Sequence, residues 1–358
     1  MRQSIAFFAS SLVSAYWNGA ATYYRGIVQA LAARGHRVTF YEPDAFDRQA
    51  HRDISDPDWA RVVIYPATEE GVERALDDAR AADLVIKASG VGVFDRLLEE
   101  RVPQLKKPGA LAVFWDVDAP ATLDRIAADE SDPFRPLIPQ YDLVLTYGGG
   151  PPVVATYERF GARLCVPIYN GLDPATHHPA QPEARFACDL ALVANRLPDR
   201  ERRIEEFFLS PAAELRDRRF LLGGNGWADK PMPDNVGYLG HVYTADHNAF
   251  NCSALAVLNV SRDSMASYGY SPATRVFEAA GAGACIITDA WEGIPLFFEP
   301  NREILVAESG PAVADKLARL TRADAKRIGA AARRRALAEH TYDRRVALLE
   351  DVLAGRTS

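Results

Sequence analysis

Short apolar runs alternate with amphipathic helical runs along almost the whole chain, and this alternation constrains the fold most. SIAFFAS (4–10) and RVTFYEP (37–43) are rich in β-forming residues and flank a stretch, 20–36, with helical apolar spacing. The same kind of apolar run recurs at 83–89, 110–117, 142–150, 163–171, 188–196, 254–262 and 284–290. Continuous apolar strands between helices are typical of parallel sheets covered on both faces. The sequence therefore predicts an α/β protein with doubly wound sheets.

The chain has 358 residues, a length that favours two domains. Residues 170–187 are rich in proline and polar residues, which predicts a linker. We expect a Rossmann-like domain at 1–168, a linker at 169–186, a second Rossmann-like domain at 187–340 and a C-terminal helix at 341–358 that packs back on the first domain. In such folds, ligands bind at the carboxyl ends of the strands, and we expect these ends to face a cleft between the domains.

Composition excludes several classes of function. A net charge of -7 argues against nucleic acid as a partner. The four cysteines and seven histidines form no C-x-x-C or H-x-x-x-H pair, so we expect no metal site and reduced thiols in the cytoplasm. No run reaches the roughly 20 apolar residues of a membrane span. The first 17 residues resemble a short signal peptide, but a first buried strand at 5–9 is favoured because the following helix needs a strand to pack on.

The stretch SPATRVFEAAGAG (271–283) carries the main candidate site. It predicts a helix with Pro272 near its first position, and a helix N-terminus is a natural binding site for a diphosphate. Arg275 and Glu278 lie three residues apart on one face, where the carboxylate can accept two hydrogen bonds from a vicinal diol such as that of ribose. The alternative is an exposed helical ion pair.

Two strand ends add candidate residues for the same ligand. Arg196 and Arg200 follow the strand at 188–194, where guanidinium groups can grip phosphate oxygens; the alternative is a solvated basic turn. Gly223, Gly224, Asn225, Gly226 and Trp227 form a turn that allows close approach of backbone to a ligand, with polar groups that could read a base edge.

The run FWDVDAP (114–120) ends another predicted strand. Asp116 or Asp118 could accept the proton of an acceptor hydroxyl, provided that it lies within reach of the nucleophile. The alternative is a turn or a helix cap. The glycines of TYGGG (146–150) likewise either receive the acceptor or form a plain tight turn.

These motifs together resemble a known family. YNGLDPATHHP (169–179) is similar to the N-G-[VI]-D-x-x-x-[FH]-x-P segment of group 1 (family 4) GT-B glycosyltransferases, and residues 275–306 resemble their E-A-x-A-x-G-x-P-V-I segment with the strand that follows it. With NVGYLGHV (235–242) and ALAVLNVSR (254–262), the resemblance is closer still to the branch named after the spore maturation protein CgeB. The resemblance is good over residues 165–310, whereas before residue 165 only the order of strands and helices is similar.

The resemblance implies a GT-B fold and transfer of a sugar from a nucleoside diphosphate sugar. It implies Glu278 on the ribose, Arg196 on the diphosphate, the turn 223–227 near the base, and Gly19 in a glycine loop over the diphosphate. It also implies that a loop lies near the sugar and phosphates; its candidate residues are Tyr270, Ser271 and Thr274.

One departure matters, because the family carries Glu-x₇-Glu and its first Glu is Tyr270 here. The lysine that usually follows the diphosphate arginine is also missing, and Arg200 or Arg202 is expected to replace it.

The sequence thus predicts a cytoplasmic, metal-independent hexosyltransferase with no cofactor besides its co-substrate. UDP is the expected nucleotide and the acceptor is unknown. Arg196 and Arg275 would stabilise the leaving diphosphate, and Asp116 or Asp118 would serve the acceptor. The alternatives are a nucleotide-sugar epimerase of the same architecture and an inactive nucleotide-binding or structural homologue.

Overall fold

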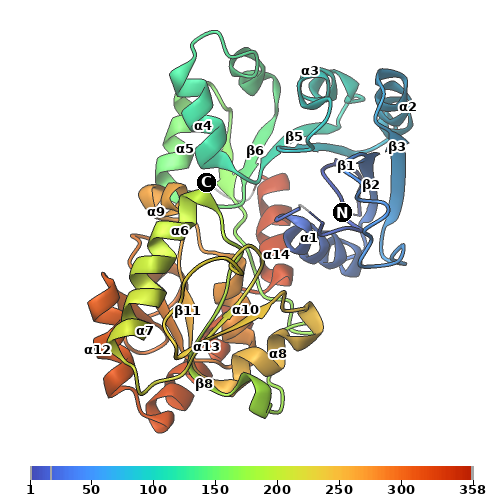
Figure 1. Ribbon diagram of the computed structural model, residues 1–358. Helices are drawn as coiled ribbons and strands as arrows, with labels where there is room; N and C mark the ends of the chain where they lie inside the picture. Colours follow the sequence, from blue (N-terminus) through green and yellow to red (C-terminus); the bar gives the residue numbers. More distant parts are fainter. Residues whose placement is uncertain (1, 17, 356–358) are drawn as a thin grey trace. The chain divides into compact units, whose positions relative to one another are not determined.

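The computed structural model describes residues 2–16 and 18–355, and the chain divides into two compact units. One unit holds the residues up to Tyr169 together with those from Tyr342 onward, and the other holds Asn170–Thr341. Positions 1, 17 and 356–358, which include the ends of the predicted first domain and C-terminal helix, lie outside the described residues. Each unit is built on one parallel sheet (Figure 1).

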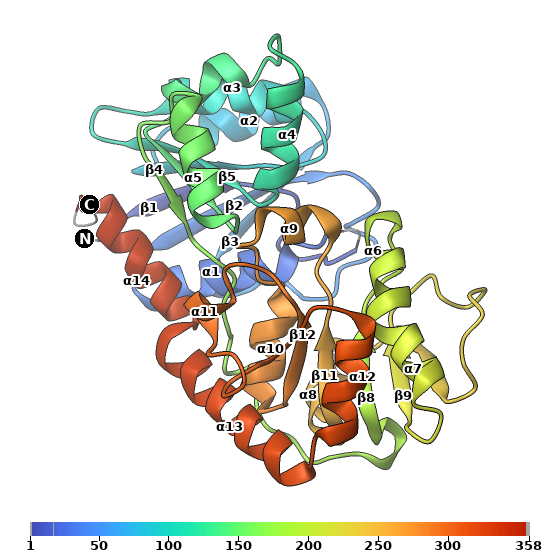
Figure 2. The same ribbon diagram turned by 90° about the vertical axis from the view of Figure 1, so that its left-hand side faces the viewer.

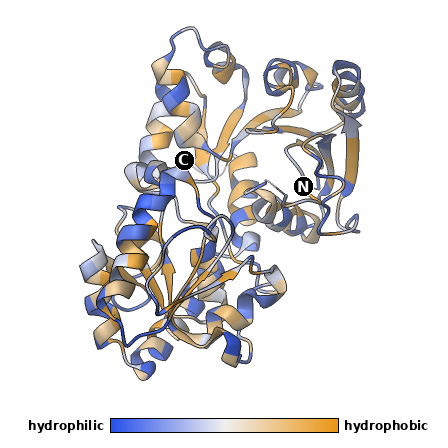
Figure 3. Cartoon of the chain, viewed as in Figure 1, coloured by the Kyte–Doolittle hydropathy of each residue, from blue (hydrophilic) through white to orange (hydrophobic). Residues whose placement is uncertain are grey.

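The sheet of the first unit has seven strands in the order β3-β2-β1-β4-β5-β6-β7. Their bounds are Ser4–Phe8 (β1), Arg37–Asp44 (β2), Arg61–Pro66 (β3), Leu84–Ala88 (β4), Leu111–Asp116 (β5), Leu143–Thr146 (β6) and Cys165–Pro167 (β7). The apolar run near the N-terminus is therefore β1, and its Ile5 lies level with Val38 of β2 and Leu84 of β4. Figure 3 shows hydrophobic residues along the strands of this unit.

The helices of this unit are α1 (Ala21–Ala33), α2 (Glu69–Ala79), α3 (Asp95–Leu105), α4 (Ala119–Ala128), α5 (Gly150–Arg159) and the last helix, α14 (Tyr342–Leu353), with a 3₁₀ turn at Arg135–Gln140. Helix α14 packs on α1 at Gly26, where an added Cβ would lie 2.3 Å from the ring of Tyr342. Val346, Leu349 and Val352 of α14 join the core beside Phe7. The C-terminal helix is thus part of the first unit.

The second unit has six parallel strands in the order β10-β9-β8-β11-β12-β13. Their bounds are Cys188–Val193 (β8), Phe220–Gly223 (β9), Val236–Gly240 (β10), Ala254–Asn259 (β11), Ile286–Asp289 (β12) and Leu305–Ala307 (β13). Its helices are α6 (Pro198–Ile204), α7 (Ser210–Glu214), α8 (Thr244–Ser253), α9 (Asp263–Tyr268), α10 (Thr274–Ala282), α11 (Ile294–Phe297), α12 (Gly310–Arg319) and α13 (Arg322–Glu339). A π-helical turn, Glu205–Leu209, joins α6 to α7. Figure 2 shows α10 beside the strands β11 and β12, whereas α12 packs against β13.

Helix α10 differs from expectation at its start and agrees at its end. Its N-cap is Ala273, so Pro272 precedes the helix and Arg275 is its second residue. Gly283 ends the helix with φ 77°, a left-handed conformation that glycine adopts without strain. Gly281 and Ala282 are still helical, so Gly283 alone ends the helix.

Residues 170–186, expected as a linker, lie against the second unit along their length. Leu172 donates its backbone N–H to the carbonyl of His340 (2.7 Å), and Asn170 donates to the carbonyl of Pro272 (3.2 Å). Further along, the backbone N–H of Glu183 donates to Ser253 of α8 (2.8 Å). The segment predicted as a linker is therefore hydrogen-bonded to the unit that it enters.

Candidate donor site in the second unit

Parallel strands place their carboxyl ends at one edge of a sheet. In the second unit these ends lead into Asn195 and Arg196 after β8, the glycine turn after β9, Val260 and Ser261 after β11, and Ala290 after β12. Helix α10 follows β11 through the short helix α9. This edge holds most of the predicted donor-binding residues.

The start of α10 has donors that its own N-cap residue cannot satisfy. Ala273 has no side-chain oxygen to accept a hydrogen bond from the first turn. Just before it, the hydroxyl of Ser271 is buried without a partner among the described residues. Thr274, the first helical residue, is half-buried. Ser271 and Thr274 thus bring hydroxyl groups to a helix start that carries a partial positive charge.

Arg275 is a half-buried cation without an ion pair in the described part of the chain. Its closest polar partner is Asn259 Oδ1 of β11, at 3.4 Å. Burial and the nearby charge of Arg200 lower the pKa of Arg275 to about 10, while the carboxylates of Glu278 and Asp289 act in the opposite direction. Two neighbouring guanidinium groups disfavour each other until an anion lies between them. The sequence suggested Arg275 and Arg200 separately, and the structure brings their charges together.

Arg196 has a different environment from the predicted one. Its guanidinium donates to Glu201 (2.8 Å) and to Asp229 (3.0 and 3.1 Å), and these pairs raise the pKa of Arg196. The same pairing lowers the pKa of Glu201 to about 2. A phosphate ligand would have to displace both carboxylates, although solvent-exposed ion pairs exchange partners readily. The predicted role of Arg196 finds no support in this geometry.

Contacts within the unit account for most residues of the glycine turn after β9. Trp227 is fully buried and donates its indole N–H to the carbonyl of Ala194 (2.7 Å), so its ring is not available to a nucleobase, against expectation. Gly224 has φ +117°, and an added Cβ would lie 2.1 Å from the oxygen of Ala194. Asn225 is exposed, with its backbone N–H bound to Asn195 Oδ1 (2.9 Å). Of Gly224, Asn225 and Trp227, only Asn225 presents its side chain.

A carboxylate stands beside Tyr270, where the resemblance led us to expect a glutamate. The Tyr270 hydroxyl donates to Glu292 Oε1 at 2.9 Å, and this bond raises the pKa of Tyr270. Glu292 follows β12, and Gly293 next to it has room for the tyrosine ring only because it lacks a Cβ. The sequence analysis missed Glu292, because the two residues are 22 positions apart and no local pattern links them.

Glu278 lies among two imidazoles that were not predicted as site residues. His177 Nε2 is 3.6 Å from Glu278 Oε1, and the rings of His177 and His247 are 6.1 Å apart. Burial lowers the pKa of His247, and the charges of His177 and Arg275 act in the same direction, whereas Glu278 opposes them. The described residues contain no group of His, Cys, Asp and Glu that could hold a metal ion. His177, His247 and Glu278 thus form a polar cluster beside α10.

Candidate residues in the first unit

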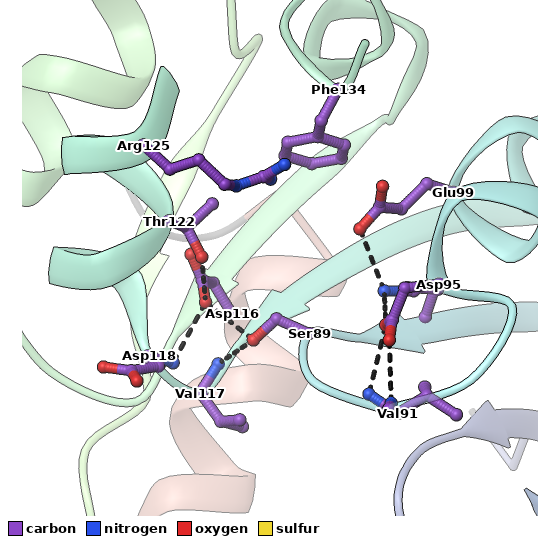
Figure 4. Close-up of polar contacts among 12 residues, drawn as sticks. Ser89, Val91, Asp95, Glu99, Asp116, Val117, Asp118, Thr122, Arg125 and Phe134 are labelled. Carbon is purple, nitrogen blue, oxygen red and sulfur yellow. Dashed lines mark hydrogen bonds and ion pairs between the residues drawn. The ribbon is translucent and has the colours of Figure 1, made fainter. Parts of the chain in front are cut away.

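Asp116 is fully buried at the end of β5, and both of its carboxylate oxygens are in use (Figure 4). Oδ1 accepts from Ser89 (2.7 Å), Thr122 (3.1 Å) and the backbone N–H of Asp118 (3.0 Å). Oδ2 accepts from the hydroxyl of Tyr157. A carboxylate with four donors and no exposed surface cannot reach an acceptor hydroxyl, so the geometry gives Asp116 a structural role.

Asp118 sits at the N-cap position of α4, the alternative that the sequence left open, but its side chain makes no capping bond. It is half-buried. Its backbone carbonyl accepts the N–H of Thr122 at 3.1 Å. Asp118 therefore remains the more accessible of the two aspartates.

A buried cation beside this cluster was not anticipated. Lys87 of β4 has no exposed surface, and its ammonium donates to Asp95 (2.6 Å) and Glu99 (3.1 Å) of α3. Asp95 also accepts the backbone N–H groups of Val91 and Gly92, which fixes the loop after β4 (Figure 4). Burial raises the pKa of Glu99, and Lys87 opposes this shift. The triad ties helix α3 to the sheet.

Gly19 precedes α1 and is exposed. No atom lies within 4 Å of an added Cβ, and Gly19 is not among the residues with positive φ. Neither packing nor backbone conformation in this unit requires glycine at the position. By contrast, Gly149 of the TYGGG run has φ +91°, and a Cβ added there would clash with Val153. The tight turn therefore requires glycine at this position.

Comparison with known proteins

A family model described as "Glycosyl transferase-like" matches residues 200–351. A search of curated protein sequences gives no match. Solved structures similar to this chain include sucrose-phosphate synthase from Thermosynechococcus elongatus, at 16% identity and a TM-score of 0.69 over 99% of both chains. They also include Anabaena HepE in complex with UDP and glucose, at 12% identity and a TM-score of 0.69 over 99% of this chain and 100% of the other. An α-glucosyltransferase in complex with UDP-glucose and DNA matches at 14% identity and a TM-score of 0.70 over the same shares.

The two parallel-sheet units and these neighbours define a GT-B fold, as the sequence predicted. The similar structures establish the fold, and the family match over residues 200–351 supports assignment of the chain as a glycosyltransferase enzyme. None of the helices in the described ranges combines the length and the apolar character that a bilayer span requires.

Proposed function

We propose that this chain transfers a sugar from a nucleoside diphosphate sugar to a hydroxyl-bearing acceptor, without a metal ion. The observation that carries the proposal is the start of α10, where Arg275, near Arg200, adjoins a helix N-terminus and Glu278 lies one turn further on. A diphosphate would accept hydrogen bonds from Arg275 and the first N–H groups of the helix, in the positive field of Arg200, and Glu278 would accept the ribose hydroxyls. The family match and the neighbours solved with UDP or UDP-glucose are consistent with UDP as the nucleotide.

The chemistry follows from charge. As the glycosidic bond breaks, negative charge grows on the leaving diphosphate, and groups already oriented toward it stabilise the transition state. Arg275 and Arg200 are better candidates for this role than Arg196, whose charge is matched by Glu201 and Asp229. Cationic side chains would then supply the positive charge that a metal supplies in other transferases.

Further features of the proposal rest on the sequence. The acceptor would bind the first unit, with Asp118 retained as the candidate base because Asp116 is buried. The net charge of -7 favours an acceptor other than nucleic acid. A cytoplasmic location and membership of the CgeB-like branch, indicated by residues 235–242 and 254–262, belong to the same proposal.

A thermal-shift screen with uridine, guanosine, adenosine and thymidine diphosphates and their sugars tests the donor. A ligand at 100 times its Kd adds about 2.7 kcal/mol to the free energy of unfolding, which corresponds to a rise in Tm of roughly 5–10 °C. We expect UDP and its sugars to give that shift. The absence of a shift with every nucleoside diphosphate would overturn the proposal.

Product analysis separates transfer from the alternatives. A transferase consumes donor in proportion to glycosylated acceptor, whereas an epimerase converts the donor when no acceptor is present. Binding of a nucleotide sugar without turnover on a broad acceptor panel would instead support an inactive nucleotide-binding homologue.

A further inference from the structure

The segment that leads into the second unit packs closely on helix α10. At Gly281 of α10, an added Cβ would lie 2.4 Å from a methyl carbon of Leu172 and 2.7 Å from the backbone oxygen of His177. Asn248 of α8 holds the same segment from the other side, because its side chain binds the carbonyl of Thr176 (2.9 Å) and the N–H of His178 (3.1 Å). His177 is therefore fixed in place by two helices.

This arrangement directs the His177 side chain toward Glu278. His177 is 4% exposed, and its Nε2 lies 3.6 Å from Glu278 Oε1. That distance is within reach of an ion pair but longer than a hydrogen bond. The other ring nitrogen, Nδ1, is buried without a hydrogen-bond partner in the described structure. A buried polar atom left in this state costs free energy unless a ligand or water completes it.

The carboxylate of Glu278 also lacks hydrogen-bond donors within the described ranges. Its side chain is 17% exposed and accepts no hydrogen bond from the residues that the structure describes. Around it, His247 binds the carbonyl of Val242 (3.3 Å) and Arg275 faces Asn259. The carboxylate is thus held among polar groups on α8, α10 and the entering segment.

We propose that His177 is a positioning residue for Glu278, and that the pair makes the site select ribonucleoside over 2′-deoxyribonucleoside diphosphates. The inference rests on the proposed function. His177 limits the carboxylate to the orientation in which it accepts from both hydroxyls of a ribose. A deoxyribose would leave one of these acceptor positions of a mostly buried carboxylate unpaired, which is a strong basis for discrimination. Donors built on thymidine diphosphate, a deoxyribonucleotide, are then excluded.

Isothermal titration of the full chain with UDP and with 2′-deoxy-UDP tests the pair through the ratio of the two Kd values. We expect the wild-type protein to prefer UDP by about tenfold or more, the range of a hydrogen bond to a charged group. His177→Phe removes the ring nitrogens at similar volume and should reduce the ratio to roughly threefold or less. His177→Gln, which keeps an amide nitrogen near the Nε2 position, should restore most of it.

The controls distinguish positioning from general damage. His178→Phe changes the adjacent exposed histidine, whose ring binds only the carbonyl of Pro179, and should keep the wild-type ratio. In Glu278→Gln the ratio should fall, and adding His177→Phe should lower it no further. Equal weakening of both ligands in His177→Phe, or an unchanged ratio, would overturn the inference while leaving the proposed function intact. Failure of the wild-type protein to bind either nucleotide would overturn the proposed function itself.

Discussion

Single side chains in the second unit show which charges the fold satisfies and which it leaves for a ligand. Arg196 has two carboxylate partners, whereas Arg275 is half-buried against an amide oxygen and near a second guanidinium. A partly desolvated cation without an ion pair adds little to stability, which fits a residue that binds an anionic ligand. Arg275 and Arg196 should therefore respond differently to substitution.

Replacing Arg275 should weaken nucleotide binding without weakening the fold. Arg275→Gln removes charge-assisted bonds to a diphosphate, and we expect UDP affinity to fall roughly 10- to 100-fold, as measured by titration. The free energy of unfolding in urea should stay the same or rise, because a desolvated like charge is removed. Arg319→Ala on the exposed face of α12 is the matched control. Retention of wild-type affinity in Arg275→Gln would remove this residue from the site.

The lowered pKa of His247 predicts a pH dependence of stability. Burial keeps this imidazole neutral below the ordinary pKa of 6.5, so the unfolded chain binds a proton that the native chain does not. The contribution is complete above pH 6.5 and is lost as the pH falls through the lowered native pKa. The charged groups that face His247 have opposite effects on its protonation: Glu278 favours it, whereas His177 and Arg275 disfavour it.

Urea unfolding between pH 5 and pH 8 measures this effect. The wild-type protein should lose more stability on acidification than His247→Gln does. Identical pH profiles for the two proteins would contradict the prediction.

At the scale of elements, the junctions between strands and helices were the hardest to predict. The alternating apolar runs identified both sheets, because burial on two faces leaves a continuous apolar pattern. The expected role of Trp227 was wrong and that of Arg196 is unsupported for one reason: each side chain binds a partner distant in sequence, Ala194 or Asp229. Local patterns locate a strand end, but they do not show which of its side chains are bound to other residues of the same protein.

The junction between β5 and α4 gives a direct test of this distinction. In Asp116→Asn, the buried group loses charge-assisted bonds from Ser89, Thr122 and Tyr157, so we expect the free energy of unfolding to fall by about 1–3 kcal/mol. UDP affinity should not change. Normal stability combined with loss of transfer would restore Asp116 as a candidate base.

At the scale of the whole molecule, the chain enters the second unit at Asn170 and leaves it after Thr341. The backbone N–H of Leu172 binds the carbonyl of His340 (2.7 Å), so the two crossings lie side by side within the second unit. The first unit is consequently assembled from both ends of the sequence, with α14 as its final element.

A destabilising substitution in α14 should lower the stability of the first unit alone. Leu349 is fully buried, and Leu349→Ala should cost about 2–5 kcal/mol through lost burial and the cavity left behind. Hydrogen exchange measured by mass spectrometry should show lost protection in α1 and β1 and unchanged protection in β11 and β12. Lost protection in the second unit instead would show that the two units do not unfold separately.

The split of the first unit also bears on how the protein is made. Translation delivers the whole of the second unit before α14 leaves the ribosome, and domains generally fold as units while they emerge. Until then the nascent first unit carries α1 without the apolar side chains of Val346, Leu349 and Val352 that cover it. The unit that is synthesised first is thus the last to be completed. In the meantime, the apolar face of its helix α1 stays uncovered.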